Sequence, residues 1–108
     1  LIYVNGSGAL IWWNTTDFAQ SFNGAVASKT WHHVAVTRAS DNYIRLYVDG
    51  QNVAKSSSTF TEDMNNFTRI VLGRHASQYF KGYISNFRIT NQVLYTHNFT
   101  PSSSSIAG

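Results

Sequence analysis

The alternation of apolar and polar residues predicts a chain built from short antiparallel strands. Residues 1–4 (LIYV) and 9–14 (ALIWWN) flank NGSG, a glycine-containing connection that is typical of a hairpin. Residues 43–50 (YIRLYVDG) place an apolar residue on one face at every second position. The pair Asp49-Gly50 predicts a tight turn, after which QNVAKS folds back as an antiparallel strand.

Residues 31–38 (WHHVAVTR) are a further predicted strand, with His32 and His33 on opposite faces. Residues 69–73 (RIVLG) predict a short buried strand, and residues 74–80 (RHASQYF) predict a loop. Between the strands lie polar stretches, which we expect to be anchored in the core by four phenylalanines: Phe18, Phe22, Phe60 and Phe67.

Residues 81–90 (KGYISNFRIT) read as the last long strand, but their alternation slips by one position. Ile84 and Phe87 are three residues apart, whereas residues on one face of a flat strand are two apart. A β-bulge inserts one extra residue and bends its strand. We therefore expect a bulge at Ser85-Asn86, with Ile84 and Phe87 both facing the core of a curved sheet.

These elements predict an all-β fold in which two antiparallel sheets form a jelly-roll sandwich. No segment has the apolar i, i+3, i+4, i+7 spacing of a helix, and no apolar stretch is long enough for a transmembrane helix. Residues 1–100 are expected to form one domain, because 108 residues suffice for a single core. The serine-rich residues 101–108 are expected to be a tail or linker.

The amino-acid composition excludes several classes of function. Aromatic residues make up 15% of the chain and charged residues only 12%, which suits β-structure. The chain has no cysteine, so disulfides and thiolate metal sites are excluded. The net charge of +3 comes from single, scattered lysines and arginines, whereas nucleic-acid binding usually needs a concentrated basic patch. We expect neither a nucleic acid nor a membrane as partner.

The order of WHHVAVTR, YIRLYVDGQNVA, IVLG, FKGYISNFRIT and LYTHNFTP resembles the laminin-G-like, concanavalin A-like lectin/glucanase domains. The last two segments are similar to modules in virion proteins of tailed bacteriophages. The resemblance implies a jelly roll that binds glycans or proteins. Modules of this family are usually longer and begin with further strands. We therefore expect a fragment of a longer protein, or sheets that neighbouring chains complete in an oligomer or larger assembly.

Catalysis is not expected. Glycosidases need two carboxylates at a set separation, and the glucanase relatives carry theirs in an alternating acidic motif on one strand. Here Glu62 and Asp63 are adjacent in a polar stretch, while Asp17, Asp41 and Asp49 fall in loops or turns. No cofactor is expected either. The alternative is a calcium ion at the oxygen-rich cluster Glu62, Asp63, Asn65 and Asn66.

Aromatic and polar side chains remain as candidate ligand-binding groups, because a flat ring with a polar tip suits both sugars and protein interfaces. Trp12 and Trp13 are consecutive on a strand, so one should be buried and the other exposed. The predicted ligand-binding residues are Trp13, Arg74, His75, Gln78 and Tyr79. For each aromatic residue, filling or capping the core is the competing interpretation, as it is for Tyr43 and Tyr47.

The sequence thus predicts a non-catalytic, lectin-like recognition module of a phage virion protein, located in the virion or outside the cell, that binds surface glycans. The alternative is a structural module that buries its aromatic residues against neighbouring virion subunits. The four glycosylation sequons, at Asn5, Asn14, Asn66 and Asn98, are interpreted as chance products of a chain rich in Asn, Ser and Thr.

Overall fold

The computed structural model describes residues 1–14, 17–61, 74–75, 78–79, 81–90 and 92–101, with the backbone alone for residues 17, 18, 74, 75, 78 and 79. The chain divides into two compact units, one formed by Leu1–Thr61 with Asn91–Pro101 and the other by Glu62–Thr90 with Ser102–Gly108. The described residues contain strands and turns but no helix, so the fold class is all-β, as predicted. No described helix could cross a membrane.

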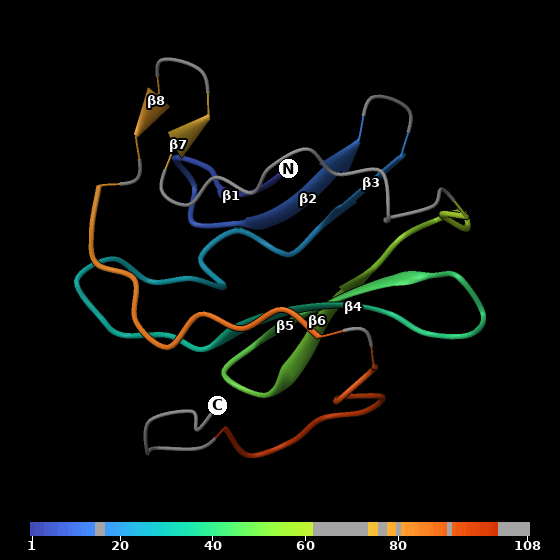
Figure 1. Ribbon diagram of the computed structural model, residues 1–108. Helices are drawn as coiled ribbons and strands as arrows, with labels where there is room; N and C mark the ends of the chain where they lie inside the picture. Colours follow the sequence, from blue (N-terminus) through green and yellow to red (C-terminus); the bar gives the residue numbers. More distant parts are fainter. Residues whose placement is uncertain (15–16, 62–73, 76–77, 80, 91, 102–108) are drawn as a thin grey trace. The chain divides into compact units, whose positions relative to one another are not determined.

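The first sheet consists of β1 (Ile2–Val4), β2 (Leu10–Asn14) and β3 (Asp17–Gln20), in that order and all antiparallel (Figure 1). The β1–β2 connection is organised by Asn5, whose side-chain oxygen accepts the backbone N–H groups of Ser7 and Ala9, both at 3.0 Å. A short side chain that bonds the following backbone is what favours asparagine in turns. The predicted hairpin is confirmed.

The second sheet consists of β4 (Val34–Arg38), β5 (Ile44–Val48) and β6 (Gln51–Lys55), again in sequence order and antiparallel. Asp49 and Gly50 join β5 to β6 with positive φ angles of 51° and 84°. Two consecutive positive φ values define the hairpin turn that matches the twist of the flanking strands, and Asp-Gly is a preferred pair for it. This turn is confirmed as predicted.

The bulge of this sheet lies in β6. Leu46 pairs with Ala54 whereas Tyr47 pairs with Asn52, so Val53 is the extra residue. The Asn52 side-chain amide donates to the carbonyl oxygens of Leu46 at 3.2 Å and Ala54 at 3.1 Å. The side chain thereby bridges the two strands where the ladder is disrupted, which explains an asparagine at this position.

The core lies between the two sheets, and Figure 1 shows them as two layers of the first unit. The inward faces of β2 and β5 supply most of it, and Phe60 packs edge-to-face on Trp12 with ring centroids 5.0 Å apart. The buried members are Leu10, Trp12, Ala19, Ile44, Leu46, Val48 and Phe60. The alternation of residues 43–50 and the anchoring role of Phe60 are therefore confirmed.

Two buried serines satisfy backbone groups at the ends of the core strands. Ser21 Oγ accepts the N–H of Leu10 at 2.8 Å, and Ser56 Oγ accepts the N–H of Ile44 at 3.0 Å. Ser21 occupies the inward position next to Ala19, so the following residue, Phe22, points away and is 64% exposed. The prediction that Phe22 enters the core is wrong for this reason.

Residues 81–90 form no strand, contrary to the prediction, and Ile84, Phe87 and Ile89 are each more than half exposed. An extended segment becomes a strand only when its backbone pairs with another strand, and no described strand pairs with this segment. Asn86 has a positive φ of 55°, so the backbone does depart from extended geometry at the predicted break. Residues 81–90 therefore have the apolar alternation of a strand but do not form the strand that it predicts.

The second unit contains a short hairpin, β7 (Arg74–His75) and β8 (Gln78–Tyr79), where the sequence predicts only a loop. Two-residue strands are too short to show an alternation, so no pattern could indicate them. The predicted strand at 69–73 and the predicted anchor Phe67 lie outside the described residues, as do residues 102–108; the side chain of Phe18 is also not described.

Candidate functional site

The outer face of the second sheet is covered by the irregular segment 92–101. Tyr95 and Phe99 from this segment stack in parallel, with ring centroids 3.6 Å apart. Tyr47 of β5 lies fully buried beneath them, 5.6 Å from Phe99 and 6.3 Å from Tyr95. His33 packs edge-on against the same two rings. For Tyr47 the capping interpretation is therefore supported, since its side chain is buried beneath these rings.

The segment is fastened to the β5–β6 turn and the start of β6. Phe99 donates its N–H to the Gly50 carbonyl at 2.8 Å, and the Asn98 side-chain oxygen accepts the N–H of Asn52 at 2.7 Å. The Asn98 amide also donates to the Gln51 side chain at 3.1 Å. A Cβ atom on Gly50 would overlap the Phe99 carbonyl oxygen, so this contact requires glycine.

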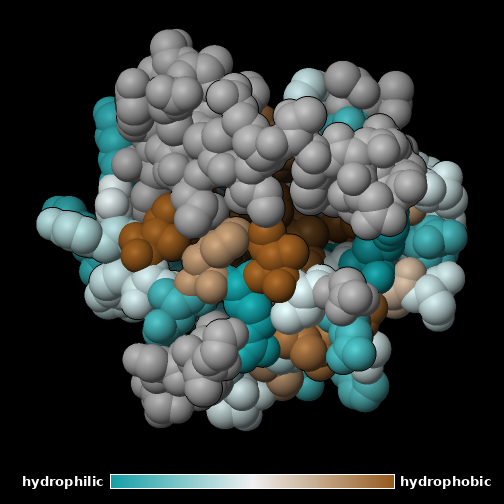
Figure 2. Space-filling model, viewed as in Figure 1, coloured by the Kyte–Doolittle hydropathy of each residue, from teal (hydrophilic) through white to brown (hydrophobic). Residues whose placement is uncertain are grey.

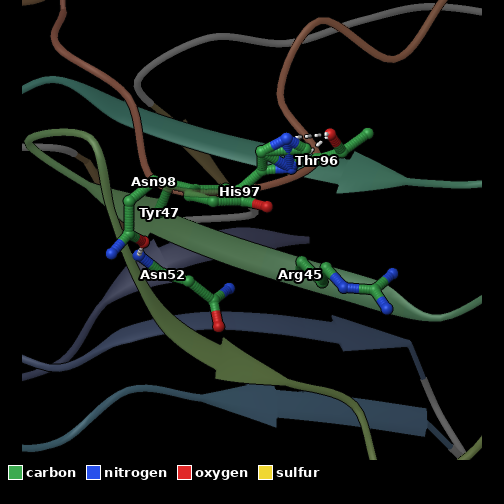
Figure 3. A pocket seen from close by; sticks show the side chains of 6 residues that line it. All are labelled: Arg45, Tyr47, Asn52, Thr96, His97 and Asn98. Atoms are coloured by element: carbon green, nitrogen blue, oxygen red, sulfur yellow. Dashed lines mark hydrogen bonds between the residues drawn. The ribbon is translucent and has the colours of Figure 1, made fainter.

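An open depression of about 370 Å³ lies beside this attachment. Figure 3 shows its walls: two side chains come from β5, one from β6 and three from the covering segment. The lining residues are Arg45, Tyr47, Asn52, Thr96, His97 and Asn98. The Thr96 hydroxyl hydrogen-bonds the His97 ring at 2.7 Å. A volume of this size lies at the lower end of the range of small-molecule sites, about 300–1,000 Å³.

The charge at one end of the depression is fixed by an ion pair. The Arg45 guanidinium donates to both Asp41 carboxylate oxygens, at 3.1 and 2.8 Å, and the Tyr43 N–H donates to the same carboxylate at 3.1 Å. The hydrogen bonds from Arg45 and then from Tyr43 lower the pKa of Asp41 to about 2, and the bond to Asp41 raises the pKa of Arg45. Beside this pair, the Lys55 ammonium lies 4.2 Å from the centre of the Tyr43 ring.

The depression offers hydrogen-bonding groups, and its lining residues include no carboxylate. Two of the five guanidinium N–H groups of Arg45 are used by Asp41, and the amide oxygen of Asn52 accepts no hydrogen bond from the residues that the structure describes. The nearby carboxyl of Asp41 is ionised at neutral pH and is fully engaged. The general acid of a typical glycosidase is a carboxyl that keeps its proton near neutral pH, and Asp41 does not supply one.

The structure places the predicted ligand-binding residues in two groups. Trp13 is 40% exposed on β2 while Trp12 is buried, so the prediction that the pair faces opposite ways is confirmed. The other four lie together in the β7–β8 hairpin, where Arg74 pairs with Tyr79 and His75 with Gln78 in backbone register. Trp13 belongs to the first unit and the hairpin to the second.

The predicted calcium alternative at Glu62, Asp63, Asn65 and Asn66 lies outside the described residues. In the part of the chain that is described, no three His, Asp or Glu side chains gather as metal ligands would. His32 and His33 do face opposite ways, as predicted: His32 is hydrogen-bonded through its ring, and His33 packs on aromatic rings.

Sequence reasoning missed the depression itself. Part of its wall is the segment Thr96–Asn98, in which the sequence analysis places no ligand-binding residue. A usable signal was the spacing of Tyr95 and Phe99, four residues apart in a segment that shows no strand alternation. Two large aromatic residues in an irregular stretch indicate packing against a sheet rather than a solvated linker.

Comparison with known families gives one match. The family model described as the concanavalin A-like lectin/glucanases superfamily, of laminin-G type, matches residues 1–98. Searches of curated proteins and of solved structures find no match. The family model covers most of the chain, and the two facing antiparallel sheets agree with it. The chain therefore belongs to the concanavalin A-like lectin/glucanases superfamily.

Proposed function

We propose that this domain is a non-catalytic recognition module that binds a surface glycan in the depression between β5, β6 and the segment Thr96–Asn98. The observation that carries the proposal is the lining of that depression, which combines a guanidinium, two amides, a hydroxyl and an imidazole. Sugars present several hydroxyl groups that both donate and accept hydrogen bonds. A site of mixed donors and acceptors on a fixed sheet surface suits that chemistry.

The site is preorganised by its neighbours. Asn52 is held by the carbonyl groups of Leu46 and Ala54, and Asn98 by the N–H of Asn52 and the side chain of Gln51. Side chains that are fixed before the ligand arrives lose little conformational entropy on binding. Membership of a family whose laminin-G-like domains are typically non-catalytic binding modules supports the same class of function.

A glycan array probed with the intact chain tests the proposal. We expect binding that is lost in His97→Ala, because His97 lines the depression and, among the described residues, its side chain hydrogen-bonds only Thr96. The matched control is Lys29→Ala, an exposed residue outside the depression, which should bind as the unaltered chain does. Equal binding by His97→Ala and Lys29→Ala would contradict the assignment of the site.

The ligand-binding residues predicted from the sequence define an alternative glycan-binding surface. It would lie either at Trp13 or at the hairpin that carries Arg74, His75, Gln78 and Tyr79. Tyr79→Ala on the same array separates the two surfaces. Loss of binding in Tyr79→Ala with full binding in His97→Ala would place the ligand at the hairpin. The reverse result supports the depression.

Assembly within a particle is the alternative function, and a separate observation favours it. Large apolar side chains are exposed in both units, and Figure 2 shows apolar side chains reaching the surface between polar ones. They include Ile2, Tyr3, Val4 and Trp31 in the first unit, and Tyr83, Ile84, Phe87 and Ile89 in the second. Where such side chains form a contiguous patch, the exposed apolar surface is typical of contacts with other proteins.

We propose that those partners are neighbouring subunits of a phage virion, with the domain located in the virion or outside the cell. Analytical ultracentrifugation separates this function from glycan binding. A chain that binds no saccharide and sediments as an oligomer supports assembly. A monomer that binds a saccharide supports recognition.

A further inference from the structure

The strand β1 is an edge strand, and its outer side has no strand neighbour among the described residues. Leu1 and Trp13 exchange two main-chain hydrogen bonds, at 2.8 and 3.0 Å, so the main-chain groups of Leu1 point toward β2. In an antiparallel pair, residues of this kind alternate with residues whose N–H and C=O groups point the other way. The main-chain groups of Ile2 and Val4 therefore point away from β2, toward the open edge of the sheet.

The side chains of this edge are apolar and exposed. Ile2 and Val4 lie opposite Trp12 and Leu10 in the β1–β2 register, so they share the core-facing side of the sheet. Trp12 and Leu10 are buried in the core, whereas Ile2 is 52% and Val4 36% exposed. Tyr3, on the other side of the sheet, is 41% exposed. The edge therefore presents apolar side chains on both faces, together with main-chain groups that can pair.

The strand β1 carries none of the features that usually protect a sheet edge. Exposed edges are protected by charged side chains, especially lysine, by proline or by a bulge. Residues 1–16 contain no charged residue and no proline, and the register of β1 with β2 is regular. The edge strand β6 of the second sheet, in contrast, has the bulge at Val53 and ends at Lys55. β1 is thus suited to pairing with a further strand.

We propose that β1 pairs in antiparallel orientation with β1 of a second copy of this chain, about a twofold axis at Tyr3. In this register Ile2 lies opposite the partner's Val4, and each of these residues donates one main-chain hydrogen bond and accepts one. The aliphatic side chains of both copies meet on the core-facing side, and the two Tyr3 rings meet on the other side. Cross-strand pairs of β-branched and of aromatic residues are stabilising. The two three-stranded sheets then join across the axis into one sheet.

A second copy fits this edge because the edge is complementary to itself. It has no charged side chain, so the twofold pairing brings no like charges together, and it exchanges two β-branched residues of similar shape. A three-residue strand covers less than the about 1,200–2,000 Å² of a standard stable interface, so we expect a weak dimer that depends on concentration. The inference rests on the assembly function and names its edge and its partner. The glycan-binding depression lies on the other sheet and is unaffected.

Sedimentation velocity over a range of protein concentrations tests the pairing. Val4→Pro removes an N–H that points to the open edge and leaves the hydrogen bonds to β2 in place. Val4→Thr keeps both the N–H and the branched shape, so it is the matched control. The unaltered chain and Val4→Thr should associate as concentration rises, and Val4→Pro should weaken the association about tenfold or more. Equal association of Val4→Pro and Val4→Thr, or a monomer at every concentration, would overturn the proposal.

Tyr3→Lys and Tyr3→Glu cover the case in which Val4→Pro does not fold. Tyr3 faces its own copy across the axis, so each variant alone places like charges opposite each other and should stay monomeric. An equimolar mixture of the two variants places opposite charges there and should recover the association. A mixture that stays monomeric while the unaltered chain associates would overturn the pairing at Tyr3.

Amide exchange and glycan binding separate this inference from the functions proposed above. The amides of Ile2 and Val4 should become protected as the unaltered chain associates. Protection of these amides in a chain that stays monomeric would overturn the proposal, because another segment of the same chain would then pair with the edge. Oligomers that form equally in Val4→Pro would overturn the pairing at β1 but leave the assembly function standing. Val4→Pro should bind the glycan array as the unaltered chain does, whichever result the sedimentation gives.

Discussion

Phe99→Ala is the substitution that tests most sharply whether the segment 92–101 is part of the folded domain. Phe99 stacks on Tyr95 with ring centroids 3.6 Å apart, and it contacts Tyr47 at 5.6 Å and His33 at 5.4 Å. Truncation to alanine removes all three ring contacts but keeps the backbone hydrogen bond to Gly50. Tyr47, which is fully buried in the unaltered protein, would become exposed.

The magnitude follows from these contacts. An aromatic pair contributes about 0.5–1.5 kcal/mol beyond its buried area, so three pairs give about 1.5–4.5 kcal/mol. Complete truncation of a fully buried phenylalanine costs about 3–5 kcal/mol, and Phe99 is partly exposed. We therefore expect the free energy of unfolding to fall by about 2–4 kcal/mol.

Urea unfolding followed by far-ultraviolet circular dichroism measures this loss, and Phe22→Ala is the matched control. Phe22 is 64% exposed, so its truncation should change the free energy of unfolding by about 0.5 kcal/mol or less. The reasoning is refuted if Phe99→Ala and Phe22→Ala unfold at the same urea concentration. In that case the rings of the segment would contribute nothing to the fold.

Three further substitutions or titrations follow from the same geometry. Gly50→Ala should cost about 3 kcal/mol or more in a thermal or urea melt, because the new Cβ would overlap the Phe99 carbonyl at a positive φ; an unchanged melt would contradict the contact. Asn52→Ala should cost about 1–2 kcal/mol, since two hydrogen bonds across the bulge are lost, and a change in unfolding below the measurement error would show that the bulge does not need them. Carbon-13 NMR should find a pKa of about 2 for Asp41. Because this pKa is lowered, the stabilisation from the pair with Arg45 is fully present above about pH 4 and is lost as the pH falls toward 2. A measured pKa near 3.8 would mean that the pair does not form in solution.

The sequence predicts those parts of the fold that depend on local pattern and turn chemistry. The alternation of Ile44, Leu46 and Val48 is bounded by a turn pair that needs positive φ, so both the strand and its inward face follow from the residues alone. Trp12 and Trp13 are another such case, because consecutive strand residues must face opposite ways.

Features that depend on contacts between residues far apart in the sequence could not be predicted. Residues 81–90 have a strand pattern, but a pattern does not specify which strand lies alongside, and no described strand pairs with this segment. The depression depends on Asn98, which meets Asn52 across 46 positions of sequence. No sequence periodicity relates two residues so far apart, so the site could not be predicted from the sequence.

The most direct measurement for the central claim is a chemical-shift map of the intact chain titrated with the saccharide that binds best on a glycan array. Our account predicts that the backbone amides of Arg45, Asn52 and Thr96–Asn98 shift with a single saturating dependence on sugar concentration. It is contradicted if the shifts concentrate at Trp13 or at residues 74–79, or if no saccharide shifts any of these amides.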